Sequence, residues 1–230
     1  MLLLAGGLLA GCSKRRPAVA ATAPAVPRNA VADDYWWFAI DPDLTKGFCI
    51  TWVQGMTPAD VLKRLGGKEL ERVGWQQLVG SGDGQQGPAY EYFIGVARIG
   101  EWSLIVEDNG DLGVTDRLVD RLSVGTTVVA HRHKPDGHGR FLVLRDAVVE
   151  LDFDPAAYTV RGGTRATELA PTIAAAGFGA RRDPRQPLLA GLALAERLTG
   201  IPMSKDLLDT HTYLLSTVPR PRDASPRKKQ

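Results

Sequence analysis

The stretch GFCITWVQGMTPADVLKRLGG, residues 47–67, holds a strand pattern followed directly by a helix pattern. Its first half is an apolar run rich in β-branched and aromatic side chains, which is typical of a buried strand. Thr57 and Pro58 then supply an N-cap and a first helical residue, and Asp60 occupies the third helical position. A pair of glycines ends the helix. The stretch predicts a domain in which strands and helices pack together.

Outward from this stretch, strand patterns dominate as far as Asp154, and helix patterns dominate after it. We predict strands at 73–80, 89–100, 101–108, 125–133 and 139–153, a helix that opens at Thr115-Asp116, and further helices at 167–178, 187–200 and 204–216. Strands followed by helices predict an α+β fold with a mainly antiparallel sheet, flanking helices and a helical C-terminal third.

The first residues, MLLLAGGLLAGC, are too short an apolar run to cross a bilayer as a helix, which takes about 20 residues. Such a run ending in small residues is typical of a signal peptide. Leu-Ala-Gly-Cys at 9–12 resembles the bacterial lipobox, in which the cysteine thiol receives a diacylglyceryl group and the chain is cut before it. The resemblance implies lipid attachment at Cys12 and a location on the extracytoplasmic side of the cell membrane.

Basic residues follow the apolar run, at 14–16, rather than precede it. Either a translation start further upstream supplies the missing basic segment, or the leader is a translated artefact on a cytoplasmic protein. We divide the chain into a lipoprotein-like signal segment (1–12), a Pro/Ala-rich linker (13–32), a single α+β domain (33–216) and a basic disordered tail (217–230). The linker lacks the large apolar residues needed to offset the entropy of ordering.

Charge is distributed unevenly along the chain. Residues 1–28 carry four basic and no acidic groups, and residues 220–230 carry five basic groups and one acidic group. Because the whole chain has a net charge of +2, residues 29–219 carry −6. An acidic domain disfavours nucleic acid as its partner, whereas the basic ends suit an anionic membrane surface.

Cys12 and Cys49 are the two cysteines. If Cys12 carries lipid, Cys49 has no partner for an intramolecular disulfide. Its apolar, β-branched surroundings in the sequence predict a buried and unreactive thiol.

Several blocks resemble an uncharacterised actinobacterial family of unknown function. These blocks are DYWWF (34–38), FCITWVQGMTPADVLKRLGG (48–67), WSLIVEDNG (102–110), LSVGT (122–126) and LALAERLTGIPMSKDLLD (192–209). The Glu-Asp-Asn-Gly and Ala-Glu-Arg-Leu-Thr-Gly blocks are the most distinctive, and the resemblance spans residues 33–209. It implies a shared fold but supplies no catalytic residues. The leader and linker are additions to the family pattern.

Two patterns that suggest chemistry have ordinary explanations. Residues 82–87 match G-x-G-x-x-G, but a proline and a strand pattern follow instead of the helix that a dinucleotide site needs, so we expect a loop. His131, His133 and His138 have a spacing that a metal site can use. We expect instead an exposed hairpin, no metal site and no cofactor.

Glu107, Asp108 and Asn109 precede a glycine at a turn, and neighbouring strand residues point to opposite faces, so turn formation explains most of this block. Trp36 and Trp37 are consecutive, and one of them can lie exposed beside the linker. We name these five residues as a possible ligand or partner surface and assign no catalytic residue.

These observations favour a membrane-anchored lipoprotein that acts as a binding module for an unknown protein or small molecule. The first alternative is a cytoplasmic interaction or immunity-type domain. The second is an enzyme with an unrecognised site, which we rank lower because no nucleophile elbow, P-loop or zinc motif is present.

Overall fold

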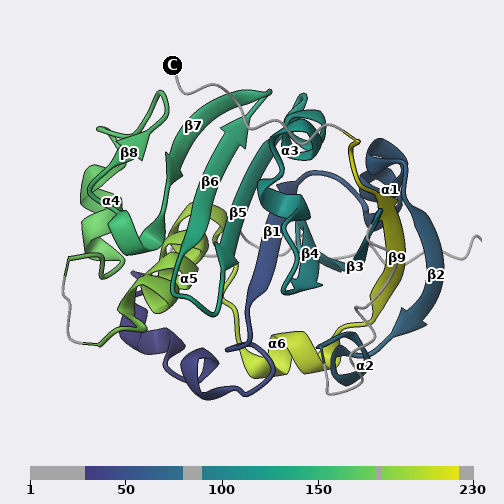
Figure 1. Cartoon of the computed structure of the whole chain (residues 1–230), viewed down its shortest axis with the longest axis horizontal. Coiled ribbons are helices and arrows are strands. Elements are labelled where there is room, and N and C mark those ends of the chain that lie inside the picture. Colours follow the sequence, from purple (N-terminus) through teal and green to yellow (C-terminus); the bar gives the residue numbers. More distant parts are fainter. Residues whose placement is uncertain (1–28, 80–89, 180–182, 223–230) are drawn as a thin grey trace, which may run out of the picture.

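The computed structural model describes residues 29–79, 90–179 and 183–222. Within these ranges, nine strands form one sheet in the order β2-β9-β3-β4-β1-β5-β6-β7-β8, and every neighbouring pair is antiparallel. In Figure 1 the sheet runs in this order from β2 at the right to β8 at the left. The strands are β1 (Phe48–Gln54), β2 (Lys68–Val73), β3 (Glu91–Ile99), β4 (Trp102–Asp108), β5 (Thr127–His133), β6 (Gly139–Arg145), β7 (Val148–Phe153), β8 (Arg161–Gly162) and β9 (Tyr213–Pro219).

Helices cover both faces of the sheet. The α-helices are α1 (Pro58–Leu65), α2 (Trp75–Val79), α3 (Asp116–Ser123), α4 (Ala170–Ala175), α5 (Gln186–Thr199) and α6 (Lys205–Thr210), and the 3-10 helices are η1 (Ala32–Tyr35), η2 (Phe38–Ile40), η3 (Leu112–Val114) and η4 (Pro155–Ala157). The predicted α+β class is thereby confirmed. None of the described helices combines the length and the apolar composition that a membrane span requires.

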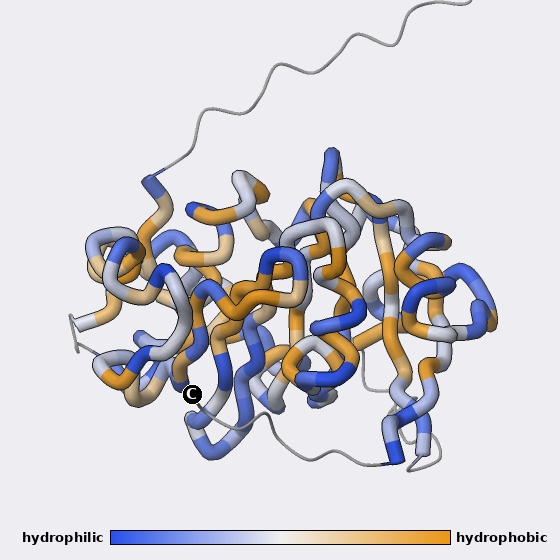
Figure 2. The backbone as a smooth tube through the Cα atoms, turned by 90° about the horizontal axis from the view of Figure 1, so that it is seen from above, coloured by the Kyte–Doolittle hydropathy of each residue, from blue (hydrophilic) through white to orange (hydrophobic). Residues whose placement is uncertain are grey.

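Strand alternation sorts the apolar side chains into a core on each face. In β1, Ile50 and Trp52 join the larger core, which packs against α5, α2, α4, α6, η1 and η2; we call this the α5 face. Val53 points the other way, into a core shared with α1, α3 and η3; we call this the α3 face. Figure 2 shows the apolar stretches running through the interior and polar stretches at the peripheral turns.

The strand and helix predicted from residues 47–67 are confirmed as β1 and α1. The Thr57 hydroxyl accepts a hydrogen bond of 3.2 Å from the Asp60 amide, and Gly66 ends α1 with a φ of 71°. Both features depend on residues within a few positions of each other, so they can be read from the sequence.

The strand predicted at 73–80 is wrong, because Trp75–Val79 forms the short helix α2. The helix predicted over 204–216 is correct only at its start. α6 ends at Thr210, and Tyr213–Pro219 becomes β9, an internal strand hydrogen-bonded to β2 on one side and β3 on the other. Two full strand ladders outweigh the local helix pattern of the leucines.

The N-terminal segment from Ala30 to Tyr35 packs against α5. The Ala32 amide donates to the Ala176 carbonyl over 3.0 Å, and the Arg197 Nε donates to the Ala30 carbonyl over 2.6 Å. Ala30 and Ala32 are buried. The Ala-Glu-Arg-Leu-Thr-Gly block, singled out as distinctive in the sequence, therefore contacts the first described residues of the chain.

Candidate functional site

The residues proposed as a ligand surface separate into two places, and Cys12 lies outside the described residues. Trp36 and Trp37 form the turn between η1 and η2. Trp36 is 42% exposed, whereas Trp37 is half-buried with its ring centroid 5.3 Å from that of Phe38. Trp36 is therefore the tryptophan of this pair that a partner can reach.

An arginine from the start of α5 covers one side of the Trp36 ring. The Arg185 Cζ lies 4.2 Å from the ring centroid, a cation–π arrangement. Asp183 holds this arginine by accepting from Nε over 2.9 Å and from Nη2 over 3.1 Å. These bonds lower the pKa of Asp183 to about 2. The Trp36 ring is thus presented in a defined orientation.

Two further apolar side chains of the same segment are exposed. Ile40 is 64% exposed and Val31 is 40% exposed. We call Val31, Trp36 and Ile40 the Trp36 surface. Its backbone is held from beneath by buried contacts between η1 and α5, so the exposed residues project from a fixed support.

Glu107, Asp108 and Asn109 have three different settings and do not join the Trp36 surface. Glu107 is buried on the α3 face with only 1% exposed. Asp108 pairs with Phe48 across the ladder and is half-buried, which raises its pKa. Asn109 is exposed with a φ of 52°, and its amide donates to the Gly47 carbonyl over 3.1 Å. Of the three residues, Asp108 and Asn109 keep side-chain surface that a partner can reach.

Glu107 fastens η3 to the sheet. Its Oε1 accepts from the Leu112 amide over 3.0 Å, and its Oε2 accepts from the Gly113 amide over 3.2 Å. The Cys49 thiol also hydrogen-bonds to this carboxyl group. Burial outweighs these bonds and raises the pKa of Glu107 to about 7. The sequence indicated a turn here, but it did not reveal a buried carboxyl.

The expectation of an exposed hairpin is wrong for His131, which is fully buried on the α5 face. Its Nε2 lies 3.1 Å from the Leu188 carbonyl, and its ring packs directly against Gly191 of α5. Burial lowers the pKa of His131 to about 3. Because α5 comes from a distant part of the sequence, the strand pattern alone gave no sign of this cover.

His133 is half-buried beside Phe48, and His138 bonds to Asp154 over 2.8 Å. Burial lowers the pKa of His133, whereas the Asp154 carboxylate raises that of His138. The described residues contain no group of three or more His, Cys, Asp or Glu side chains placed to hold a metal. The glycine pattern at 82–87 lies outside the described residues.

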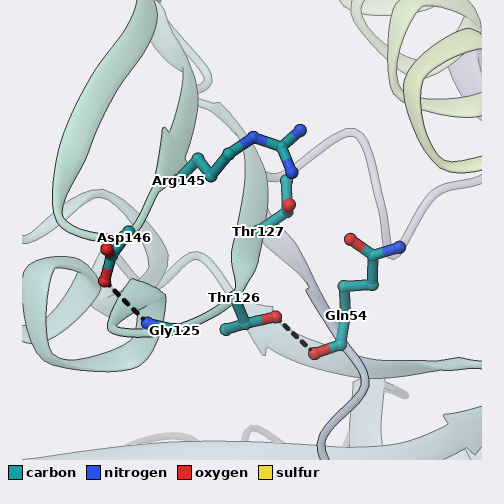
Figure 3. A pocket seen from close by; sticks show the side chains of 6 residues that line it. All are labelled: Gln54, Gly125, Thr126, Thr127, Arg145 and Asp146. Atoms are coloured by element: carbon teal, nitrogen blue, oxygen red, sulfur yellow. Dashed lines mark hydrogen bonds between the residues drawn. The ribbon is translucent and has the colours of Figure 1, made fainter.

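Sequence reasoning did not find a shallow hollow of about 470 Å³ at the end of the sheet where β1 and β6 finish and β5 begins. Figure 3 shows Thr127 lying between the Arg145 and Gln54 side chains there. Arg145 is engaged through Nε with Glu150 over 2.8 Å. The Thr126 hydroxyl donates to the Gln54 carbonyl over 2.6 Å. These contacts secure the turns of the sheet and bring together no nucleophile and base.

Comparison with known proteins identifies the family of the chain. A model of a family described as a family of unknown function, DUF6461, matches residues 28–223. No curated protein and no solved structure matches the chain. The matched region includes all of the described strands and helices. The chain belongs to DUF6461, a family of unknown function.

Proposed function

We propose that this chain is a membrane-anchored lipoprotein whose folded domain binds a protein partner through the Trp36 surface. The observation that carries the binding role is the exposure of Trp36 and Ile40 on one firmly supported segment. Tryptophan is enriched where binding energy concentrates, because it buries a large apolar area at a small entropic cost. The motif resemblance adds an actinobacterial source to this proposal.

Charge indicates the kind of partner. Residues 29–219 carry a net charge of −6, and Asp33 and Asp34 are exposed next to Trp36. A partner surface with an apolar centre and basic residues around it is complementary to this arrangement. Complementary charge accelerates association and disfavours acidic competitors.

The anchor rests on the Leu-Ala-Gly-Cys sequence at 9–12. A diacylglyceryl group gives two acyl chains, which suffice for stable attachment where one chain does not. The linker joins Cys12 to Ala30, the start of the packed segment, and a fully extended chain of this length reaches about 60 Å. The Trp36 surface would lie near the point where the linker joins the domain.

Metabolic labelling with a fatty-acid analogue tests the anchor. Wild-type protein should take up label and fractionate with membranes, and Cys12→Ala should lose both properties. Cys49→Ala is the matched control, because it removes the other cysteine of the chain and should keep the label. An unlabelled wild-type protein in the cytosol would overturn the anchor and favour the cytoplasmic interaction domain.

Crosslinking in intact cells identifies the protein that lies against the domain. Binding of that purified partner to the purified chain then tests the binding role. Trp36→Ser combined with Ile40→Ser should weaken the reconstituted complex at least tenfold. Leu70→Ser is the control, since Leu70 is 47% exposed on β2 at the opposite edge of the sheet (Figure 1). If the wild type, the double variant and Leu70→Ser all bind the partner with equal affinity, the Trp36 surface is excluded as the binding site.

A further inference from the structure

One buried carboxyl group fastens the segment between Asn109 and Thr115 to the sheet. We propose that proton binding to this group, on Glu107, keeps the segment closed, and that the segment opens locally as the pH rises and uncovers the Cys49 thiol. The proposal is independent of the anchor and of the Trp36 surface.

Glu107 shares the attachment of the segment with two arginines: the Arg132 Nε donates to the Gly110 carbonyl over 3.0 Å, and the Arg140 Nη1 donates to the Val114 carbonyl over 2.8 Å. Both oxygens of Glu107 accept backbone amides of η3, from Leu112 over 3.0 Å and from Gly113 over 3.2 Å. Packing leaves no room between η3 and the sheet. A Cβ atom at Gly113 would lie 1.8 Å from the Thr51 Oγ1 and 2.9 Å from the Cys49 Sγ. A Cβ atom at Gly110 would likewise clash with the Glu107 side chain, and Glu107 is almost completely shielded from solvent in the closed segment.

The groups that donate hydrogen bonds to the Glu107 carboxyl are all neutral: two backbone amides and the Cys49 thiol. An ionised carboxylate that is buried without a cation is poorly compensated. No cation forms an ion pair with Glu107 in the part of the chain that the structure describes. Burial itself therefore favours the protonated form.

The charged side chains around the segment bind its backbone or one another rather than Glu107. The charged and titratable groups that face it come from β3, the η3 loop, α3, β5, β6 and the residue after β9: Tyr92, Asp111, Asp116, Arg132, Arg140 and Arg220. Arg132 and Arg220 approach Asp111 to 3.9 Å and 3.4 Å. Arg140 binds both Asp116 and Asp152. The charge of Asp111 raises the pKa of Glu107 further.

The direction of the pH effect follows from proton linkage. The closed segment gives Glu107 a pKa of about 7, whereas a solvated glutamate has its ordinary value of 4.5. Between these values the closed form holds a proton that the open form releases, so a rising pH favours opening. The equilibrium constant for opening should increase by up to about tenfold per pH unit in this window and level off above it.

Opening would expose a thiol that the closed form protects. Cys49 is completely buried, and burial raises the pKa of the thiol. The closed segment therefore suppresses the reactive thiolate. Loss of the η3 contacts would remove the cover that Gly113 and Val114 give Cys49, and leave Val119 of α3 in the same cluster. We expect this partial uncovering to give a reagent access to the thiol.

Amide hydrogen exchange on the full chain, between about pH 5 and 7.5, tests the linkage. After correction for the intrinsic exchange rate, protection of the Leu112 and Gly113 amides should fall several-fold per pH unit. Glu107→Gln should abolish this slope. Asp108→Asn is the matched control, because it removes the neighbouring half-buried carboxyl and should keep the slope. Protection that is independent of pH in the wild type would overturn the proposal.

Thiol alkylation gives a second readout that needs no change at Glu107. In a Cys12→Ala background, Cys49 is the remaining cysteine. Its alkylation rate, divided by the rate of the unfolded chain at the same pH, should rise in parallel with exchange of the Leu112 amide. If the Leu112 amide exchanges while Cys49 stays unreactive, opening of the segment does not uncover the thiol, and this part of the proposal is wrong.

Discussion

The Tyr35 hydroxyl donates a hydrogen bond of 2.7 Å to the Glu196 Oε2, joining η1 to α5 across 161 positions of the sequence. The same phenol oxygen accepts the Met203 amide over 3.3 Å. Burial and the Glu196 carboxylate raise the pKa of Tyr35, so the phenol remains a donor at every physiological pH. This pair connects the start of the described chain to the most buried helix of the α5 face.

Tyr35→Phe removes a donor from a buried carboxylate while keeping the aromatic ring. We expect the free energy of unfolding to fall by about 1–3 kcal/mol, because the cost of desolvating the carboxylate is no longer offset by the phenol. Urea unfolding measures the difference. Tyr90→Phe is the control: Tyr90 is 68% exposed, and its variant should stay within about 0.5 kcal/mol of wild type. Equal effects of the two substitutions would show that the Tyr35 bond contributes nothing to stability.

His131 should make the fold sensitive to acid. Its pKa is about 3 in the folded chain and 6.5 in the unfolded chain, so the unfolded state takes up a proton first as the pH falls. Stability is therefore fully present above pH 6.5 and is lost towards pH 3, by at most about 1.4 kcal/mol per pH unit.

His131→Leu should reduce this loss in urea unfolding measured across the same range. His138→Gln should act in the opposite direction and make the loss steeper, because Asp154 raises the pKa of His138 and so favours the folded state in acid. An unchanged pH profile for His131→Leu would contradict a neutral buried imidazole.

Gly191→Ala tests the contact between α5 and β5. A Cβ atom at this position would lie 2.4 Å from the His131 Nε2, so either the helix or the buried ring must move. We expect a loss of about 1–3 kcal/mol from overpacking, seen as a lower melting temperature. Gly74→Ala is the matched control, because no atom lies within 4 Å of a Cβ built there. A Gly191→Ala protein as stable as this control would contradict close packing of α5 on the sheet.

Two N-terminal truncations test whether η1 contributes to the stability of the domain. A chain that begins at residue 29 keeps the bonds of Ala30, Ala32 and Tyr35 to the α4–α5 region, and its urea midpoint should match that of the full chain. A chain that begins at residue 37 loses all three and should unfold at a lower urea concentration or fail to fold. Equal midpoints for the two truncations would show that η1 is dispensable.

The sequence by itself determined the features that depend on neighbouring residues. Thr57, Pro58 and Asp60 specify the start of α1, and the apolar run before them specifies β1. The succession of strands and helices was enough for the α+β class, since each class has its own order of elements. The consecutive tryptophans were also sufficient to suggest an exposed aromatic residue beside the linker.

Only the tertiary structure decided the elements and side chains whose partners are distant in the chain. Tyr213–Pro219 carries leucines that suit a helix, but hydrogen bonds to β2 and β3 make it a strand. His131 lies on a strand with polar neighbours, but α5 covers it, and Glu107 stands next to a turn that folds back over it. Burial and strand pairing arise from residues far apart in sequence, so local patterns carry no record of them.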